Sequence, residues 1–364
     1  MKIAFHADQI GLRGTEVSLF DYADYCERLL GYQSVIIYDS KNPHSHPSGV
    51  EKFRSRFPLI GYDEFTDVDR ILAAEKAELI YFIKVTKTDC RLASEVPTAV
   101  HAVFTTPARQ AHGAAFAYVS QWLADKYSNG RLPSVPHMVT LPQPRQNLRR
   151  ELGIPKSAFV LGCHGGPHSF NIAFARKVVA EALQRRADLY FVAMNIEPFC
   201  AHPHAMFLPG SADPVRKADF IECCDAMLHA RENGETFGLA CGEFSLRNKP
   251  VITYSGSRHR AHIDILGPAG VLYRNARGLG DILLNIDHGF VRARQWDRYS
   301  KAFSPQAVIP QFDKVFVRRE AHVPARAPTP VERLVRYQIA RIWPAPAWRT
   351  RGILAAAVDQ PVSA

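Results

Sequence analysis

Residues 225–254 read DAMLHARENGETFGLACGEFSLRNKPVITY, and this stretch decides the fold expected for the chain. The apolar run Ala226–His229 predicts a buried strand, and Pro250–Tyr254 predicts the next strand. A helix is expected between them, beginning near Thr236 and ending before the proline, which cannot continue a helix. A strand, a helix and a strand at this spacing predict a βαβ unit with parallel strands.

The start of the expected helix offers a site for a diphosphate. Free backbone N–H groups at a helix N-terminus favour an anion. Here they belong to Thr236, Phe237, Gly238 and Leu239. The glycine also lets a ligand approach the backbone closely.

Glu235 and Glu243 flank these amides, and eight residues of helix would separate them by roughly 12 Å. That span suits one carboxylate that accepts hydroxyls of a sugar and another that accepts those of a ribose.

The same alternation continues in both directions along the chain. Further strands are expected at residues 2–7, 34–38, 79–83, 98–104, 116–119, 159–163, 189–194 and 270–273. Helices are expected at residues 15–30, 69–75, 172–185, 214–223, 237–246 and 276–286. This pattern predicts an α/β protein with two Rossmann-like domains that face each other across a cleft.

We expect three parts along the chain. Residues 1–145 form the first Rossmann-like domain, and residues 146–310 form the second. The basic segment 311–364 is expected to be partly helical and to pack back on the domains. The polar, basic stretch at residues 142–150 is the expected linker.

Composition excludes several classes of protein. A hydrophobic fraction of 47% with 22% charged residues excludes a disordered chain. No apolar run approaches the roughly 18–20 residues of a membrane-spanning helix. The N-terminus has no apolar stretch typical of a secretory signal. Seven scattered cysteines are typical of reduced thiols. We therefore expect a cytoplasmic protein.

The formal net charge of +10 favours anionic partners. Nucleic acid is not expected, because no zinc-finger spacing, RNP-like strand or basic heptad run is present. The residues from Val317 onward are rich in arginine and include Trp343 and Trp348. Two interpretations of this segment stay open: a solvated tail with a packed helix, or a peripheral contact with an anionic membrane.

The segment 225–254 resembles the donor-site signature of the family-4 glycosyltransferases, which are retaining enzymes with the GT-B fold. The resemblance implies that Glu235 contacts the transferred sugar, that the amides of Thr236 to Leu239 hold the diphosphate, and that Glu243 holds the ribose. It also implies a nucleotide-diphosphate sugar donor, retention of configuration, no metal or other cofactor, and a saccharide or lipid-linked saccharide acceptor. It covers roughly residues 1–290 and is specific only within 225–254.

Other positions agree with this resemblance. Gly14 lies in the first βα turn, where the family places a glycine against the diphosphate, and Arg13 stands where a second glycine is common. His101 matches the strand-end histidine near the reacting sugar and is, with Glu235, an expected catalytic residue, although a lone histidine after an apolar run is more often structural. Ser120 matches a serine that precedes a helix, and no catalytic role is carried over to it.

The sequence differs from the family at two positions that usually carry cations. After the first strand of the second domain the family usually presents an arginine and, five residues later, a lysine. Cys163 and His168 stand there instead, and a thiol and a mostly neutral imidazole bind phosphate more weakly than fixed cations. His168 and His164 remain expected donor-binding residues. Arg13, His164, Arg258 and Arg260 are the expected sources of compensation.

Two alternatives to an enzyme follow from these features. The loss of the cation pair favours a non-catalytic nucleotide-sugar binder, and the net charge favours a basic surface-binding protein. Metal sites are not expected. The pair Asp67 and Asp69 has the spacing of a metal-binding motif but is better interpreted as a helix N-cap. Cys163, His164 and His168 lack a fourth zinc ligand at suitable spacing.

Overall fold

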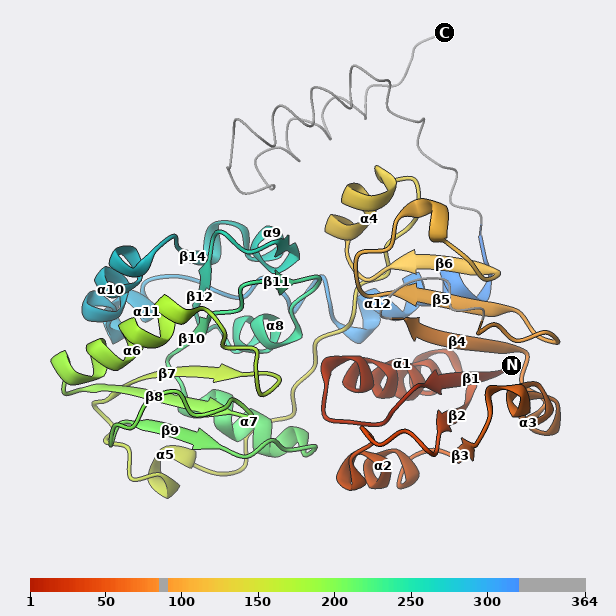
Figure 1. Ribbon diagram of the computed structural model, residues 1–364, viewed down its shortest axis with the longest axis horizontal. Helices are drawn as coiled ribbons and strands as arrows, with labels where there is room; N and C mark the ends of the chain where they lie inside the picture. The colour runs from red at the N-terminus through yellow and green to blue at the C-terminus, as the bar shows by residue number, and fades with distance from the viewer. Residues whose placement is uncertain (85–90, 321–364) are drawn as a thin grey trace, which may run out of the picture.

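The computed structural model describes residues 1–84 and 91–320, which form two α/β domains side by side (Figure 1). The first domain has a parallel six-stranded sheet of β1 (Lys2–Ala7), β2 (Gln33–Asp39), β3 (Leu59–Tyr62), β4 (Leu79–Lys84), β5 (Thr98–Ala102) and β6 (Ala115–Tyr118). Its helices are α1 (Gly14–Leu30), α2 (Pro47–Arg54), α3 (Val68–Glu75) and α4 (Gln121–Ser128).

The second domain repeats this plan. Its parallel six-stranded sheet contains β7 (Phe159–His164), β8 (Leu189–Met194), β9 (Ala205–Leu208), β10 (Ala226–His229), β12 (Val251–Tyr254) and β14 (Gly270–Tyr273). Its helices are α5 (Leu148–Glu151), α6 (Ala173–Arg185), α7 (Pro214–Cys223), α8 (Leu239–Leu246), α9 (Ala261–Leu266), α10 (Ala276–Asn285) and α11 (His288–Arg292). A small parallel ladder joins β11 (Gly234–Glu235) to β13 (His259–Arg260).

The two sheets have the same strand order. The first runs β3-β2-β1-β4-β5-β6, and the second, taken from its other edge, runs β9-β8-β7-β10-β12-β14. Each order reverses direction once, between β1 and β4 and between β7 and β10. In open parallel sheets, ligands bind at the carboxyl ends of the strands at such a reversal. The expected GT-B arrangement of two Rossmann-like domains is therefore confirmed, and it places a ligand site beside β1, β7 and β10.

Apolar packing holds the elements in place. Helix α1 buries Leu19, Tyr22 and Cys26 against the first sheet, at the spacing of one helix face. It ends at Gly31, whose φ of 69° is the left-handed conformation that closes a helix. One continuous apolar cluster contains residues of both domains, among them Tyr118 and Phe244, so the domains share part of their core.

The chain crosses between the domains twice. The first crossing runs from Val139 into the basic stretch at residues 142–150, where Asp219 accepts hydrogen bonds from the backbone N–H groups of Arg145 and Gln146, at 2.6 and 3.0 Å. The second crossing leads into α12 (Pro305–Phe312), which packs on α1 and buries Phe312 in the core of the first domain. At the crossings, the N–H of Val139 donates a 2.9 Å hydrogen bond to the carbonyl oxygen of Phe303.

Several local predictions differ from the structure. Strands β3 and β9 were not expected, since each is a four-residue edge strand that is too short to show a periodic pattern. Asp67 occupies the expected N-cap position of α3, but its side chain pairs with Arg70 and makes no capping hydrogen bond. Asp69 accepts a hydrogen bond from the N–H of Ser94.

Within residues 1–84 and 91–320, no helix has both the length and the apolar character needed to cross a bilayer. The arginine-rich segment beyond Glu320, for which a membrane contact was one interpretation, lies outside the described residues.

Candidate functional site

The two domains meet at the start of two helices. Gly14 is the first residue of α1, and Leu239 is the first residue of α8. A methyl group placed on Gly14 would lie 3.0 Å from Cδ1 of Leu239. The absent side chain of Gly14 therefore lets the N-termini of helices from different domains approach each other, and both helix dipoles favour an anion between them.

Helix α8 begins three residues later than the sequence predicts. Gly238 has a φ of 97°, so it cannot be part of the helix and instead forms its N-cap. Within the described residues, the N–H groups of Thr236, Phe237 and Gly238 donate no hydrogen bond. These expected diphosphate-binding amides lie in the turn before the helix. A Cβ on Gly238 would also lie 2.8 Å from Cβ of His262, so the turn has no room for a side chain.

Glu235 is an ionised carboxylate next to this turn. Its Oε1 lies 3.2 Å from Nε2 of His229 and 2.9 Å from Nη1 of Arg231, and its side chain is 21% exposed. Burial acts to raise the pKa of Glu235, but the contacts with His229 and Arg231 outweigh it and hold the pKa at about 2. Glu235 can therefore accept hydroxyl hydrogen bonds at neutral pH and is a poor proton donor.

A hydrogen-bonded row behind Glu235 fixes its position. Nδ1 of His229 lies 2.9 Å from Oγ1 of Thr253, and that oxygen lies 3.0 Å from Nε2 of His262. The Tyr273 hydroxyl donates to the carbonyl oxygen of His229. His229, Thr253 and His262 are buried. A row of hydrogen bonds between buried side chains rigidifies a site.

Glu243 is engaged by two side chains. Its Oε1 forms an ion pair with Lys217 of α7, and its Oε2 lies 2.9 Å from Nε2 of His164 at the end of β7. Burial acts to raise the pKa of Glu243, and the charge of Lys217 and the contact with His164 lower it to about 2. Both carboxylate oxygens therefore have protein partners, so a ribose would share Glu243 with Lys217 and His164.

Asp21 extends this charged group into the first domain. It lies on α1, seven residues after Gly14 and therefore on the same side of the helix. Burial raises the pKa of Asp21 to about 7, although the charges of Lys52 and Lys217 act to lower it. The cluster of Asp21, Lys52, Lys217 and Glu243 thus spans the interface between the domains.

The two residues at the usual cation positions lie in different surroundings. Cys163 is 4% exposed in the core of the second domain, and burial raises the pKa of its thiol to about 12, so it stays uncharged. His168 lies on an exposed loop, with Nδ1 3.0 Å from Oε2 of Glu197. The structure brings neither of them to the start of α8 as a fixed cation.

His101 is an interior residue. It is 0% exposed, its Nδ1 lies 2.6 Å from the Tyr81 hydroxyl, and its Nε2 lies 2.8 Å from the carbonyl oxygen of Val135. Burial lowers its pKa to about 3. Its ring contacts that of His137, which contacts Phe237 at the turn before α8. We therefore assign His101 to the support of this turn and leave it out of the proposed catalytic groups.

Cations from other positions lie around the proposed site. Arg231 forms the ion pair with Glu235 described above. Arg260 is the backbone neighbour of Glu235 in the β11–β13 register, and its Nη1 donates a hydrogen bond to the carbonyl oxygen of Ser255. Arg13 is exposed at the cap of α1, where its charge acts on Glu16. Arg260 and Arg13 were expected from the sequence as compensating cations, whereas Arg231 and Lys217 were not.

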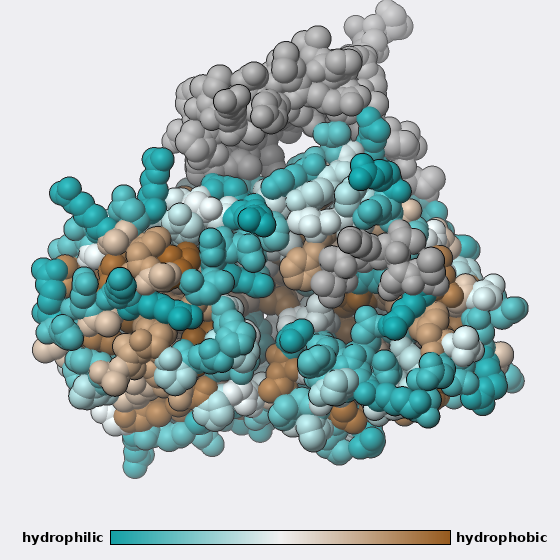
Figure 2. Space-filling view, viewed as in Figure 1, coloured by the Kyte–Doolittle hydropathy of each residue, from teal (hydrophilic) through white to brown (hydrophobic). Residues whose placement is uncertain are grey.

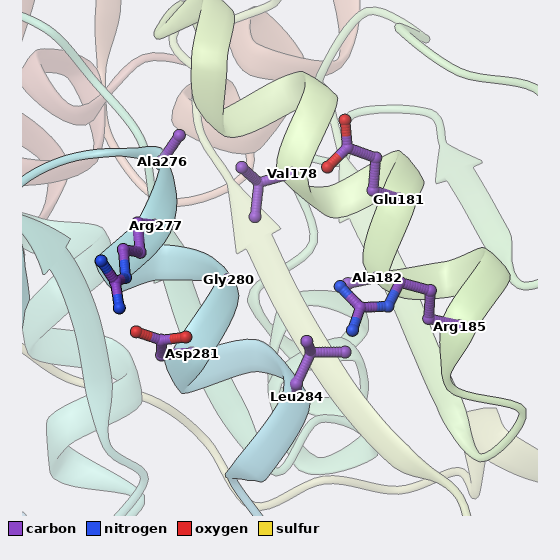
Figure 3. Close-up of a pocket in the computed structure, with 9 residues that line it drawn as sticks. All are labelled: Val178, Glu181, Ala182, Arg185, Ala276, Arg277, Gly280, Asp281 and Leu284. Carbon is purple, nitrogen blue, oxygen red and sulfur yellow. The ribbon is translucent and has the colours of Figure 1, made fainter.

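A separate surface pocket lies between α6 and α10 (Figure 3). Its lining includes Glu181 and Arg185 of α6 and Arg277 and Asp281 of α10. These helices lie on the outer side of the second domain, away from α1 and α8 (Figure 1). The pocket is therefore not part of the site at the domain interface. No group of three or more potential metal ligands occurs among the described residues.

The strand order and the position of the site define the GT-B class of fold. One solved structure of this fold is Alr3699/HepE of Anabaena in complex with UDP and glucose. Its TM-score is 0.67 at 16% identity, over 86% of this chain and 98% of that one. A glycosyltransferase from Rickettsia africae has a TM-score of 0.60 at 13% identity, over 85% and 96% of the two chains.

Sucrose-phosphate synthase from Thermosynechococcus elongatus also has this fold, with a TM-score of 0.54 at 11% identity over 94% of this chain and 98% of that one. No protein-family model and no curated protein matches the sequence. Identities of 11–16% establish the shared fold. Because one fold can carry different activities, the function has to be argued from the site.

Proposed function

We propose that this protein is a glycosyltransferase that moves a sugar from a nucleotide-diphosphate sugar to a saccharide or lipid-linked saccharide. The observation that carries the proposal is the position of Glu235: an ionised, partly exposed carboxylate directly before the free amides of residues 236–238, opposite Gly14 of the other domain. A carboxylate that accepts hydrogen bonds from sugar hydroxyls, beside amides that donate hydrogen bonds to a diphosphate, matches the two ends of a nucleotide sugar.

In this proposal, catalysis consists of positioning and electrostatic stabilisation. Glu235 orients the transferred sugar, while the free amides and the dipole of α8 stabilise the departing diphosphate. Arg260, whose backbone lies next to that of Glu235 in the β11–β13 register, is the cation proposed to take the place of the pair replaced by Cys163 and His168. Retention of configuration and independence of metal are proposed from the resemblance of residues 225–254 to the family-4 signature.

The solved structures suggest which donor to test first. The Anabaena protein of the same fold was crystallised with UDP-glucose, and another protein of this fold with UDP. We propose a uridine nucleotide sugar as donor and the first domain as the acceptor side of the site.

The test compares Glu235→Gln with Glu232→Gln. Glu232 is an exposed carboxylate three residues earlier in the same loop, so its substitution removes the same charge without touching the proposed site. UDP at about 100 times its dissociation constant should stabilise the wild-type fold by roughly 2.7 kcal/mol, which is visible as a thermal shift. We expect Glu232→Gln to turn over UDP-glucose like the wild type and Glu235→Gln to lose at least about a hundredfold in turnover. Wild-type turnover by Glu235→Gln would contradict the assignment.

A non-catalytic nucleotide-sugar binder is the second candidate, and the placement of Cys163 and His168 favours it. Neither residue supplies a cation at the start of α8. In that case UDP-glucose would stabilise the fold, but no donor would be consumed with any acceptor. The thermal-shift and turnover measurements together separate the two candidates.

A further inference from the structure

Three cations gather on one side of the interface between the domains. Lys126 lies on α4 of the first domain, whereas Arg258 and Arg260 lie on the segment around β13 of the second. We call these three residues the interdomain basic cluster. Lys126 and Arg258 are exposed, and Arg260 is partly buried. On the face shown in Figure 2, the molecule is hollowed between the two domains, with mostly hydrophilic side chains around the hollow.

Specific contacts hold the cluster together. The ring of Trp122 on α4 contacts the ring of His259 edge to face, with centroids 5.8 Å apart. Nζ of Lys126 lies 4.4 Å from the centre of the Trp122 ring. Since His259 lies between Arg258 and Arg260 in the chain, this aromatic contact brings the lysine of one domain to the arginines of the other.

The positive charges act on one another. Burial lowers the pKa of Lys126, and the charges of Arg258 and Arg260 lower it further. Burial also lowers the pKa of His259, with Lys126, Arg231 and Arg258 adding to the effect. All these cations are therefore within electrostatic reach of each other, and their mutual repulsion is unfavourable.

Little negative charge offsets this repulsion. Within residues 1–84 and 91–320, no ion pair joins Lys126, Arg258 or Arg260 to a carboxylate. The charge of Asp264 on α9 reaches Arg260, and Glu235 is already paired with Arg231. Arg260 also donates a hydrogen bond through Nη1 to the carbonyl oxygen of Ser255, which carries no full charge. Among the described residues the cations of the cluster thus outnumber the nearby anions, and a bound anion would balance them.

We propose that the interdomain basic cluster binds a phosphate group carried by the acceptor. This inference rests on the proposed function, because it identifies the acceptor of the same site as a phosphate-bearing molecule. Arg260 lies next to Glu235 in the β11–β13 ladder, so a phosphate held there lies beside the transferred sugar. Guanidinium groups fit phosphate oxygens in pairs, and Lys126 adds a point charge from the acceptor domain.

The phosphate can belong to a soluble sugar phosphate or to a lipid. The test therefore has two arms: glucose 1-phosphate, with uncharged methyl glucoside as its control, and vesicles of phosphatidylcholine with or without phosphatidic acid. Binding is measured by calorimetry and co-sedimentation with the full chain. The variant is Lys126→Gln with Arg258→Gln, which keeps Arg260 beside the proposed donor site.

The matched control is Lys177→Gln with Arg54→Gln. These exposed residues lie on α6 and α2, away from the cluster, and their substitution removes the same total charge. We expect the cluster variant to bind glucose 1-phosphate at least about tenfold more weakly than the wild type, because two charge-assisted contacts are lost. The control should bind it as the wild type does. Binding in the vesicle arm that depends on Lys126 and Arg258 would assign the phosphate to a lipid acceptor.

Three results would overturn the proposal. One is equal phosphate binding by the cluster variant and the wild type in both arms. Another is an equal loss of binding in the control, which would make the effect one of net charge. The third is a loss of the UDP thermal shift in the cluster variant that is as large as its loss of phosphate binding, which would assign the cluster to the donor. If UDP causes no thermal shift in the wild type, the proposed function is rejected instead. The glucose 1-phosphate arm would then test only whether the cluster binds phosphate.

Discussion

Gly14 and Leu239 lie in contact across the interface, although 225 residues separate them in the chain. A methyl group on Gly14 would lie 3.0 Å from Cδ1 of Leu239, a distance tighter than ordinary van der Waals contact. The Leu239 side chain therefore packs directly against the backbone of Gly14, and a side chain at position 14 would meet it.

Substitution of Gly14 should separate the two helix starts. In Gly14→Val, the new side chain meets Leu239 and forces the domains apart at this point, so UDP should bind about tenfold more weakly while the melting temperature changes little. The control is Gly278→Val, in the first turn of α10, where the nearest atom to a new Cβ is 3.6 Å away. Calorimetry with UDP checks the difference. Unchanged affinity in Gly14→Val would show that UDP does not use this contact.

Gly238→Ala should destabilise the fold more than an alanine at another left-handed glycine. Gly238 combines a φ of 97° with a distance of 2.8 Å from a new Cβ to His262, whereas Gly31 has a φ of 69° and nothing within 4 Å. We expect a loss of about 1 kcal/mol for Gly31→Ala and about 2–4 kcal/mol for Gly238→Ala. Urea denaturation measures both. Equal losses would mean that His262 moves aside freely.

The buried pair of Glu243 and Lys217 should show strong energetic coupling. Removing either partner leaves a buried charge and should cost about 3 kcal/mol, whereas the double variant Glu243→Gln with Lys217→Met should cost less than the sum. Arg216, the neighbour of Lys217 on α7, pairs with Glu151 at the surface and provides a control cycle with much weaker coupling. Additive losses for the buried pair would contradict the ion-pair geometry.

The same pair predicts a dependence on acid. The pKa of Glu243 is about 2 in the folded protein against 4.5 for an unperturbed carboxyl. Its stabilising contribution is therefore complete above about pH 4.5 and is lost as the pH falls towards 2. The denaturation midpoints of the wild type and Glu243→Gln should therefore differ less at pH 3 than at pH 7. Midpoints that stay equally far apart would contradict the lowered pKa.

Asp21 predicts the opposite dependence. Burial raises its pKa from 3.8 to about 7, so the folded protein binds a proton more strongly than the unfolded chain between about pH 4 and pH 7. Ionisation of Asp21 therefore lowers the free energy of unfolding more and more as the pH rises across that window, and the loss is complete above it. Asp21→Asn should raise stability at pH 8, on the order of 1–2 kcal/mol, and change it little at pH 4. The exposed Asp63→Asn should give no such pH-dependent gain in a thermal melt.

Much of the fold could be predicted from local sequence. The alternation of apolar strands with amphipathic helices predicted the parallel sheets because buried parallel strands are nearly continuous apolar runs. The segment 225–254 predicted β10, α8 and β12 and placed Glu235 at the site. Ser120 was matched to a serine before a helix, and in the structure its Oγ accepts a hydrogen bond from the N–H of Leu123 at the start of α4.

What could not be predicted depends on contacts between distant residues. The late start of α8 follows from the left-handed conformation of Gly238, which a glycine permits but does not signal. The β11–β13 ladder joins two-residue strands whose pairing depends on tertiary packing. Lys217 is 26 residues from Glu243 and appears in the sequence as an ordinary charge on a helix. His101 lies on the expected strand, but its imidazole is buried and bonded to Tyr81 and Val135.

The two crossings of the chain between the domains have a mechanical consequence. They are hydrogen-bonded to each other, from the N–H of Val139 to the carbonyl oxygen of Phe303, so both covalent connections run through one place. Sliding of one domain along the other would stretch both connections at once, whereas rotation about their common position stretches neither. We therefore expect any opening of the domains to be a rotation about this position that separates Gly14 from Leu239.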